Sequence, residues 1–264
     1  MIKIKKGIDI HLVGEAKKEV RNYEPQLFAI KPQDFIGLIP KLHVAEGDEV
    51  KVGTVLFHDK KNEDVFFTSP VSGKVKEVVR GEKRVILKVV VESDGKNEAI
   101  DFGKAEPSKL SRNEVIEKMI QSGTWAMLRQ RPYSTIAKVQ DKPKCIVVSM
   151  FDTAPMAPDN NFIIANQMEA VKAGAEALAK LTDGQVYLNV NSEETKKALE
   201  ALKFSAKNIS VNVFQGPHPA GNVSTQLNVL SPINKGEVVW YCYAQDIISI
   251  GNLFLTGNYD SKRI

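Results

Sequence analysis

Cysteine is scarce in this sequence, which contains only Cys145 and Cys242 among its 264 residues. Each lies in its own apolar run, and no C-x-x-C pair or cysteine cluster occurs. Thiolate ligation of zinc or of an iron–sulfur cluster takes several cysteines at short spacing, so both kinds of site are excluded. We expect both cysteines to be buried free thiols.

Long hydrophobic runs are missing as well. No apolar stretch approaches the roughly 18 residues that a membrane-spanning helix needs. The first 20 residues contain neither the apolar core nor the cleavage site of a signal peptide. The sequence therefore predicts a protein that is cytoplasmic or peripheral to a membrane.

The excess of positive charge is small, a net +4 at pH 7, and the basic residues are spread along the chain. No nucleic-acid partner is expected from such a distribution. The densest basic cluster lies between residues 74 and 88 and includes Lys83 and Arg84. This cluster is either a solvated hairpin or a docking surface for an acidic partner or an anionic lipid surface.

Common catalytic and nucleotide-binding motifs are also absent. The chain has no G-x-G-x-x-G, P-loop, H-E-x-x-H or G-x-S-x-G pattern, and its four histidines are scattered. Dinucleotide binding is therefore not expected. His218, between two prolines in G-P-H-P-A-G, lies either in a rigid structural loop or in a ligand site.

Alternating strands and glycine turns fill residues 40–79. An E-G-D-x-V-x-x-G-x-x-L segment followed by P-x-x-G-x-V resembles the barrel-sandwich hybrid of biotinyl and lipoyl carrier domains. The matching residues are Glu46, Gly47, Asp48, Val50, Gly53 and Leu56, and then Pro70, Gly73 and Val75.

Carrier domains hold a modified lysine at the tip of the hairpin between these halves. Here the tip contains Lys60 and Lys61, but no methionine flanks them as in the biotin pattern, and Asn62 occupies the place of a lipoyl site. Charged hairpin tips are usually solvated turns. We therefore predict a structural or docking module, with a carrier component of a multi-enzyme complex as the alternative.

The second half has the pattern of an α/β domain. Ser111 and Glu114 form a capping box that predicts a helix ending at Gly123. From residue 144, apolar strands at 145–150, 185–190 and 209–214 alternate with helices expected at 166–181 and 193–203. This order predicts a Rossmann-like parallel sheet covered on both faces, with any ligand beyond the carboxyl ends of its strands.

The domain organisation follows from these patterns. We expect a barrel-sandwich hybrid domain at 1–104, including an N-terminal strand within residues 2–12. A Rossmann-like domain at 105–257 follows, because Gly103 and Pro107 interrupt both periodicities.

Four segments together resemble the A subunit of the bacterial sodium-translocating NADH:quinone oxidoreductase. They are IKIKKGIDI, FTSPVSGKV with RGEKRV, GPHPAG, and QDIISIGNLFLTG, in the same order as in that family. The resemblance implies a subunit without its own redox centre, peripheral on the cytoplasmic side of the inner membrane of a bacterium. NADH, flavins, iron–sulfur and quinone would be used by other subunits of the complex. The partners of this chain would be those subunits, chiefly the membrane subunits. Members are longer, so 258–264 is expected to begin a further part.

Related flavin subunits of complex I hold FMN in a glycine-rich loop after the first helix. The corresponding stretch, residues 122–134, contains bulky residues in place of the glycines, so FMN is not expected. Within it, the run Arg129, Arg131, Pro132 and Tyr133 is predicted to be an exposed loop. A free-standing flavin or nucleotide enzyme stays a third alternative.

Quinone contacts, if present in this chain, are expected in two loops. A quinone head group needs apolar or aromatic walls and a donor for its carbonyls. The residues that offer these features are Phe35, Gly37 and Pro40 in one loop and Arg131, Tyr133 and Ser134 in the other. The alternative is that both are ordinary surface loops.

Overall fold

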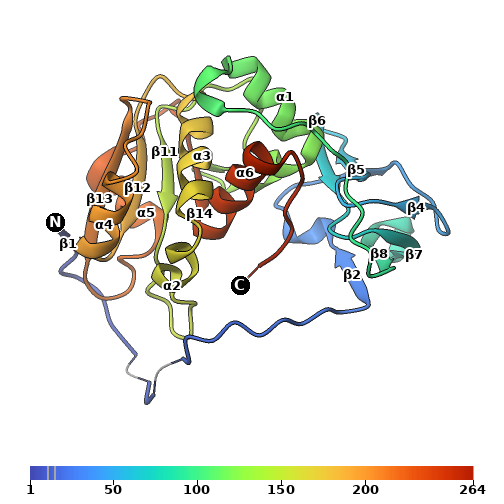
Figure 1. Cartoon of the computed structure of the whole chain (residues 1–264), viewed down its shortest axis with the longest axis horizontal. Coiled ribbons are helices and arrows are strands. Elements are labelled where there is room, and N and C mark those ends of the chain that lie inside the picture. The colour runs from blue at the N-terminus through green and yellow to red at the C-terminus, as the bar shows by residue number, and fades with distance from the viewer. Residues whose placement is uncertain (11, 15, 264) are drawn as a thin grey trace.

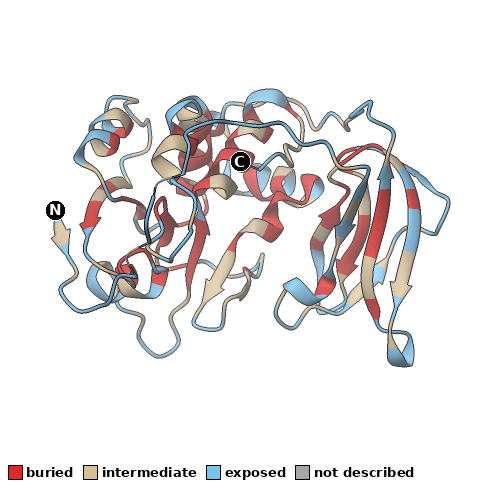
Figure 2. Ribbon diagram, turned by 90° about the horizontal axis from the view of Figure 1, so that it is seen from below, coloured by how far each residue is buried: buried red, intermediate tan, exposed pale blue. Residues whose placement is uncertain are grey.

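The computed structural model describes residues 1–10, 12–14 and 16–263. The chain folds into a small β-barrel part and a larger α/β part that lie side by side (Figure 1). Buried residues fill the interior of the barrel and the space between sheet and helices, whereas the connection from the first strand to the barrel is almost entirely exposed (Figure 2). No helix in the described ranges is long and apolar enough to cross a bilayer.

Two antiparallel sheets make the barrel part. The four-stranded sheet has the order β2 (Leu27–Ile30), β8 (Ile86–Ser93), β7 (Gly73–Arg80) and β4 (Glu49–Val50). The three-stranded sheet has the order β3 (Pro40–Leu42), β5 (Val55–Asp59) and β6 (Asn62–Thr68). Short 3-10 helices are η1 (Pro32–Asp34) and η2 (Glu82–Arg84).

Alternation along these strands builds the core of the barrel, as the sequence predicts. Leu56, Val65, Val75 and Val89 are at most 1% exposed. Gly47, in a predicted turn, has a φ of 96°, and Gly53 of the matching motif has a φ of 91°, a conformation that favours glycine. The prediction of a barrel-sandwich hybrid is confirmed.

One seven-stranded sheet organises the α/β part. Its order is β1 (Ile2–Lys3), β13 (Ile209–Gln215), β12 (Val186–Val190), β11 (Ile146–Ser149), β14 (Val239–Tyr243), β9 (Arg129–Arg131) and β10 (Thr135–Ile136). The first five run parallel, as expected for a Rossmann-like domain, and β9 and β10 add an antiparallel hairpin.

Helices cover both faces of this sheet. They are η3 (Pro107–Lys109), α1 (Arg112–Ser122), η4 (Thr124–Met127), α2 (Asn160–Ala165), α3 (Met168–Ala179), α4 (Glu193–Glu200), α5 (Val223–Leu230) and α6 (Ala244–Thr256). Val148 packs in the core that α3 and α6 share, whereas its neighbour Val147 packs with Val223 and Leu227 of α5 on the opposite face.

Three expectations are corrected. The N-terminal strand does not belong to the barrel: β1 pairs with β13 at the edge of the large sheet, and position 11 of the predicted stretch lies outside the described residues. The helix expected at 166–181 begins at Met168, and a separate short helix, α2, precedes it. The exposed loop predicted at 129–133 is a loop only in part, because Arg129–Arg131 forms the partly buried strand β9 and the exposed turn begins after it.

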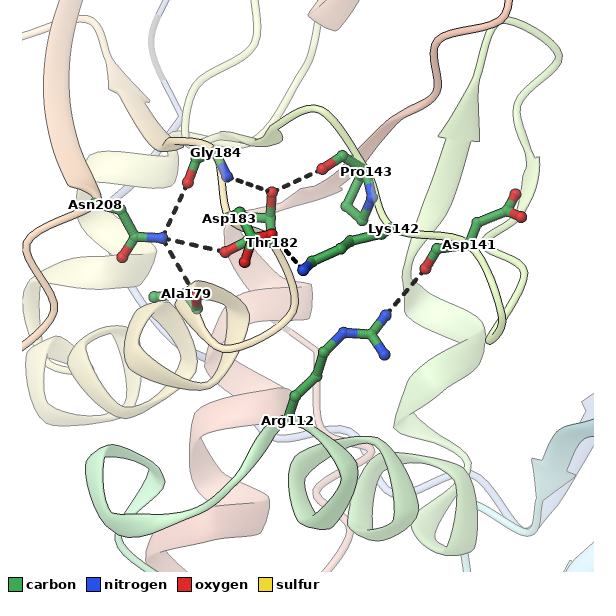
Figure 3. A network of polar contacts seen from close by, with 9 residues as sticks. All are labelled: Arg112, Asp141, Lys142, Pro143, Ala179, Thr182, Asp183, Gly184 and Asn208. Carbon is green, nitrogen blue, oxygen red and sulfur yellow. Dashed lines mark hydrogen bonds and ion pairs between the residues drawn. The ribbon is translucent and has the colours of Figure 1, made fainter.

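The amino ends of the parallel strands are closed by a polar network (Figure 3). The Asn208 side-chain amide donates to the carbonyl oxygens of Ala179, Thr182 and Gly184 at 3.3, 3.4 and 2.9 Å. The Thr182 hydroxyl donates to the carbonyl of Pro143 at 2.7 Å. These bonds tie together the loops that enter β11, β12 and β13, which leaves the carboxyl ends as the edge available for a ligand.

Candidate functional site

A cavity of about 390 Å³ lies between the barrel and the α/β part. Its walls come from twelve residues of both parts. The barrel side supplies Ile30, Phe35, Phe67 and Thr68, and the α/β side supplies Gly123, Ala126, Met127, Arg129, Tyr243, Asp246, Tyr259 and Arg263. This volume is in the range of small-molecule sites, and the lining has the usual composition of apolar and aromatic walls with a few polar groups.

Phe35 and Arg129 form one wall. The Phe35 ring, just after η1, meets the Phe67 ring edge-on with centroids 4.6 Å apart. The Arg129 guanidinium lies 4.8 Å from the Phe35 ring centroid, a cation–π contact across the two parts. Within the described part of the chain, that guanidinium makes no hydrogen bond and no ion pair.

The end of α1 joins the barrel at the bottom of this wall. The Ser111–Glu114 capping box starts the helix, and Gly123, with φ of 80°, ends it, as predicted. The Thr68 hydroxyl of β6 donates to the carbonyl oxygen of Ser122 at 3.0 Å. A Cβ atom on Gly123 would lie 2.5 Å from Thr68 Oγ1, so the backbone and the barrel approach each other as closely as glycine allows.

The opposite wall carries a carboxylate between two donors. Asp246 accepts from the Tyr243 backbone N–H at 3.0 Å, and its other oxygen pairs with Arg263 Nη2 at 3.0 Å. Burial raises the pKa of Asp246, and the charge of Arg263 opposes that rise. Burial likewise raises the pKa of the neighbouring Tyr259. The carboxylate is thus already committed to protein partners.

Residues 257–263 pass over this side of the cavity as a strap. The Gly257 carbonyl accepts from the Phe102 N–H at 2.7 Å, and Asn252 of α6 donates to Asp260 at 2.8 Å. The Ser261 hydroxyl then donates to the carbonyl of Pro70 in the barrel at 2.7 Å. The strap therefore ties the two parts together beside the cavity.

Only one of the six predicted quinone contacts lines the cavity. Phe35 does, whereas Gly37 lies further along the connection to β3, Pro40 is the first residue of β3, and neither is part of the lining. Arg131 and Ser134 lie on the β9–β10 hairpin. The Arg131 guanidinium sits 5.1 Å from the Tyr241 ring centroid, and the Tyr241 hydroxyl donates to the Ser134 hydroxyl at 3.1 Å. Tyr133 at the tip is 78% exposed.

The cavity lies at the end of a strand, β14, that the sequence analysis did not include among the strands expected to carry a ligand site. The segments expected to hold a ligand follow β11, β12 and β13, whereas the cavity is next to Tyr243 at the carboxyl end of β14. In the segment after β13, His218 Nδ1 lies 3.1 Å from the Thr153 hydroxyl. Its backbone N–H donates to Asp9 at 2.9 Å, so this loop is fixed by the N-terminal segment.

The stretch that would form a flavin loop is filled by its own side chains. Trp125 and Leu128 are fully buried, and Trp125 Nε1 donates to the carbonyl of Ala137 at 2.8 Å. A glycine-rich loop leaves space and free N–H groups for a phosphate. Residues 122–134 therefore do not fit FMN.

Two histidines that are 15 positions apart in the sequence meet in the barrel. His43 Nε2 lies 2.6 Å from His58 Nδ1, and the His58 side chain is buried. Burial lowers the pKa of His43, and the neighbouring His58 and Lys41 add to the effect. No group of three or more ligating side chains that could hold a metal ion occurs in the described ranges.

The two lysine-containing turns of the barrel lie at hairpin tips. Lys60 and Lys61 form the two-residue turn between β5 and β6, where Asp59 pairs with Asn62. Lys83 and Arg84 form the turn between β7 and β8, are exposed, and make no ion pair within the described ranges.

Comparison with known proteins gives two family matches. The family described as the NqrA N-terminal barrel-sandwich hybrid domain matches residues 2–94, and that described as the NqrA second alpha/beta domain matches residues 110–259. Similar proteins, each named as the A subunit of a Na(+)-translocating NADH-quinone reductase, occur in Vibrio atlanticus, Vibrio vulnificus and Serratia proteamaculans. They are 40%, 41% and 38% identical over the whole of this chain. The chain spans 58 to 59% of the length of these relatives.

Proposed function

The chain belongs to the NqrA family, the A subunits of Na(+)-translocating NADH-quinone reductases, and on this premise we propose that it is a membrane-peripheral subunit of such a complex. In this proposal the complex moves electrons from NADH to ubiquinone or menaquinone and exports sodium ions across the inner membrane of a bacterium. The chain lies on the cytoplasmic side and binds the membrane subunits. The shared name of the relatives supports the type of complex.

The chain contributes no redox centre of its own in this proposal. Trp125 and Leu128 fill the place of a flavin loop, and Cys145 and Cys242 are buried in different cores of the α/β part. Flavins and iron–sulfur clusters then belong to other subunits. The purified chain should be colourless and should not oxidise NADH. A flavin absorption band that survives dialysis would contradict this.

The cavity between the two parts holds the head group of a quinone. The observation that carries this proposal is the cation–π contact between the Phe35 ring and the Arg129 guanidinium, which makes no hydrogen bond or ion pair in the described part of the chain. The aromatic and apolar lining suits a flat ring, and a guanidinium can donate to a ring carbonyl. Among the expected contacts we retain Phe35, and we add Arg129.

A pair of matched variants tests this site. Arg129 and Arg131 are two residues apart in β9 and so lie on the same side of the strand. Each lies over an aromatic ring, but of the two only Arg129 lines the cavity. Isothermal titration of the chain with a short-chain ubiquinone should show about tenfold weaker binding for Arg129→Gln, because a hydrogen bond to a charged donor is lost. Arg131→Gln should bind like the parent. No binding by the parent would refute the site.

The basic hairpin tip of the barrel docks the chain on the membrane part of the complex. Lys83 and Arg84 are exposed and unpaired within the described ranges, which leaves their charges available to a partner. Charges at the rim of an interface chiefly change association and its salt dependence. Recovery of the chain with tagged membrane subunits at two salt concentrations tests this role.

A further inference from the structure

The charges in the cavity do not balance. Two guanidinium groups, of Arg129 and Arg263, face one carboxylate, that of Asp246. Arg263 pairs with Asp246 at 3.0 Å, and the second carboxylate oxygen accepts a backbone N–H. Arg129 makes a cation–π contact with the Phe35 ring, and its charge also acts on Asp246, but that carboxylate is already paired with Arg263.

The remaining lining cannot supply the missing negative charge. It is aliphatic, aromatic or glycine apart from three hydroxyl groups. The Thr68 hydroxyl donates to a backbone carbonyl, and the two tyrosine hydroxyls, of Tyr243 and Tyr259, have pKa values that burial raises, so they stay neutral. The lining therefore carries one positive charge more than its single carboxylate can balance, and a ligand that brings an anionic oxygen would balance it.

We propose that this cavity prefers ring ligands that carry an anionic oxygen, such as a hydroxyquinone or phenolate anion, over neutral quinones of the same shape, and that Arg129 sets this preference. The inference rests on the proposed quinone site and specifies its ligand class. A neutral carbonyl and an anionic oxygen both accept a charge-assisted hydrogen bond from a guanidinium, but only the anion adds the Coulomb attraction between two full charges. We therefore expect about tenfold tighter binding of the anion.

Two naphthoquinones test the preference. 2-Hydroxy-1,4-naphthoquinone is a vinylogous acid that is ionised at neutral pH, and its 2-methoxy ether has nearly the same shape without the charge. Isothermal titration of the whole chain at pH 7.5 should give about tenfold tighter binding for the hydroxy compound. The ratio should fall close to one in Arg129→Gln and should stay at the parent value in Arg131→Gln.

A salt titration of the parent gives a second readout that needs no variant. Raising the ionic strength should weaken binding of the hydroxy compound and leave that of the methoxy ether nearly unchanged, because only the former depends on charge attraction. Equal affinities of the two compounds in the parent, or an unchanged ratio in Arg129→Gln, would overturn the preference while the quinone site stands. Failure of both compounds and of ubiquinone to bind the parent would overturn both proposals.

Discussion

Gly123 is the position where the contact between the barrel and the α/β part can be tested most sharply. Its φ of 80° is unfavourable for alanine by about 1–2 kcal/mol. An added Cβ would lie 2.5 Å from Thr68 Oγ1 and 2.9 Å from Thr68 Cγ2. Thr68 is β-branched and buried, so it cannot turn away freely. Overpacking of this kind costs about 1–3 kcal/mol more.

We therefore predict that Gly123→Ala lowers the free energy of unfolding by about 2–5 kcal/mol. Gly95→Ala is a matched control, because Gly95 has a similar φ of 73° and nothing within 4 Å of the added Cβ. It should cost only the backbone term, about 1–2 kcal/mol. Urea denaturation with linear extrapolation measures both.

A double-mutant cycle isolates the clash. Thr68→Ala removes the two atoms nearest to the added Cβ and, on its own, costs about 1 kcal/mol for the lost hydrogen bond to Ser122. In this background Gly123→Ala should cost about 1–3 kcal/mol less than in the parent. Additive effects of the two substitutions, or equal costs of Gly123→Ala and Gly95→Ala, would refute the close contact on which the cavity depends.

Three further predictions concern the thiol, the basic tip and the histidine pair. Cys145→Ser should destabilise the chain by about 1 kcal/mol without stopping turnover of the assembled complex, because it places a more polar hydroxyl in a buried site where Ser231 offers a hydrogen-bond partner; unchanged melting with lost turnover would contradict this. Reversal of Lys83 and Arg84 to Glu should weaken recovery with membrane subunits most at low salt and leave the melting temperature unchanged; equal recovery would leave only a solvated hairpin. Folding lowers the pKa of His43 below its ordinary value of 6.5, so the free energy of unfolding should fall as the pH drops from 6.5 through the lowered pKa. If His43→Gln and the parent show the same dependence of stability on pH, this prediction is refuted.

Local patterns in the sequence predicted the elements that local interactions determine. The capping box at Ser111 and the stop at Gly123 were correct, because both are set by residues within one helix. The barrel strands were also correct, since glycine turns and alternation are local signals. The helix predicted at 166–181 is shorter in the structure, where α3 spans Met168–Ala179. Its first residue was predicted wrongly because the helix begins after Gln167, whose side chain makes no capping hydrogen bond.

The partners of edge strands could not be predicted in the same way. Residues 2–12 alternate equally well for either sheet, and the pairing of Ile2 with Phe214 joins opposite ends of the sequence. The β9–β10 hairpin has only five residues in strands, too few for a periodic signal. Its assignment as a loop hid Arg129, which the fold brings onto Phe35 from a distant segment. The cavity therefore forms only in the tertiary structure, from distant segments, and no single sequence motif predicts it.

The central claim is that the cavity between the two parts binds a quinone head group. A crystal structure of the chain grown with a short-chain ubiquinone tests this most directly. The account predicts ring density between Phe35 and the wall formed by Tyr243 and Asp246, with a ring oxygen within hydrogen-bond distance of the Arg129 guanidinium. A ring bound elsewhere on the chain, for example along the β9–β10 hairpin at Tyr133, would contradict it.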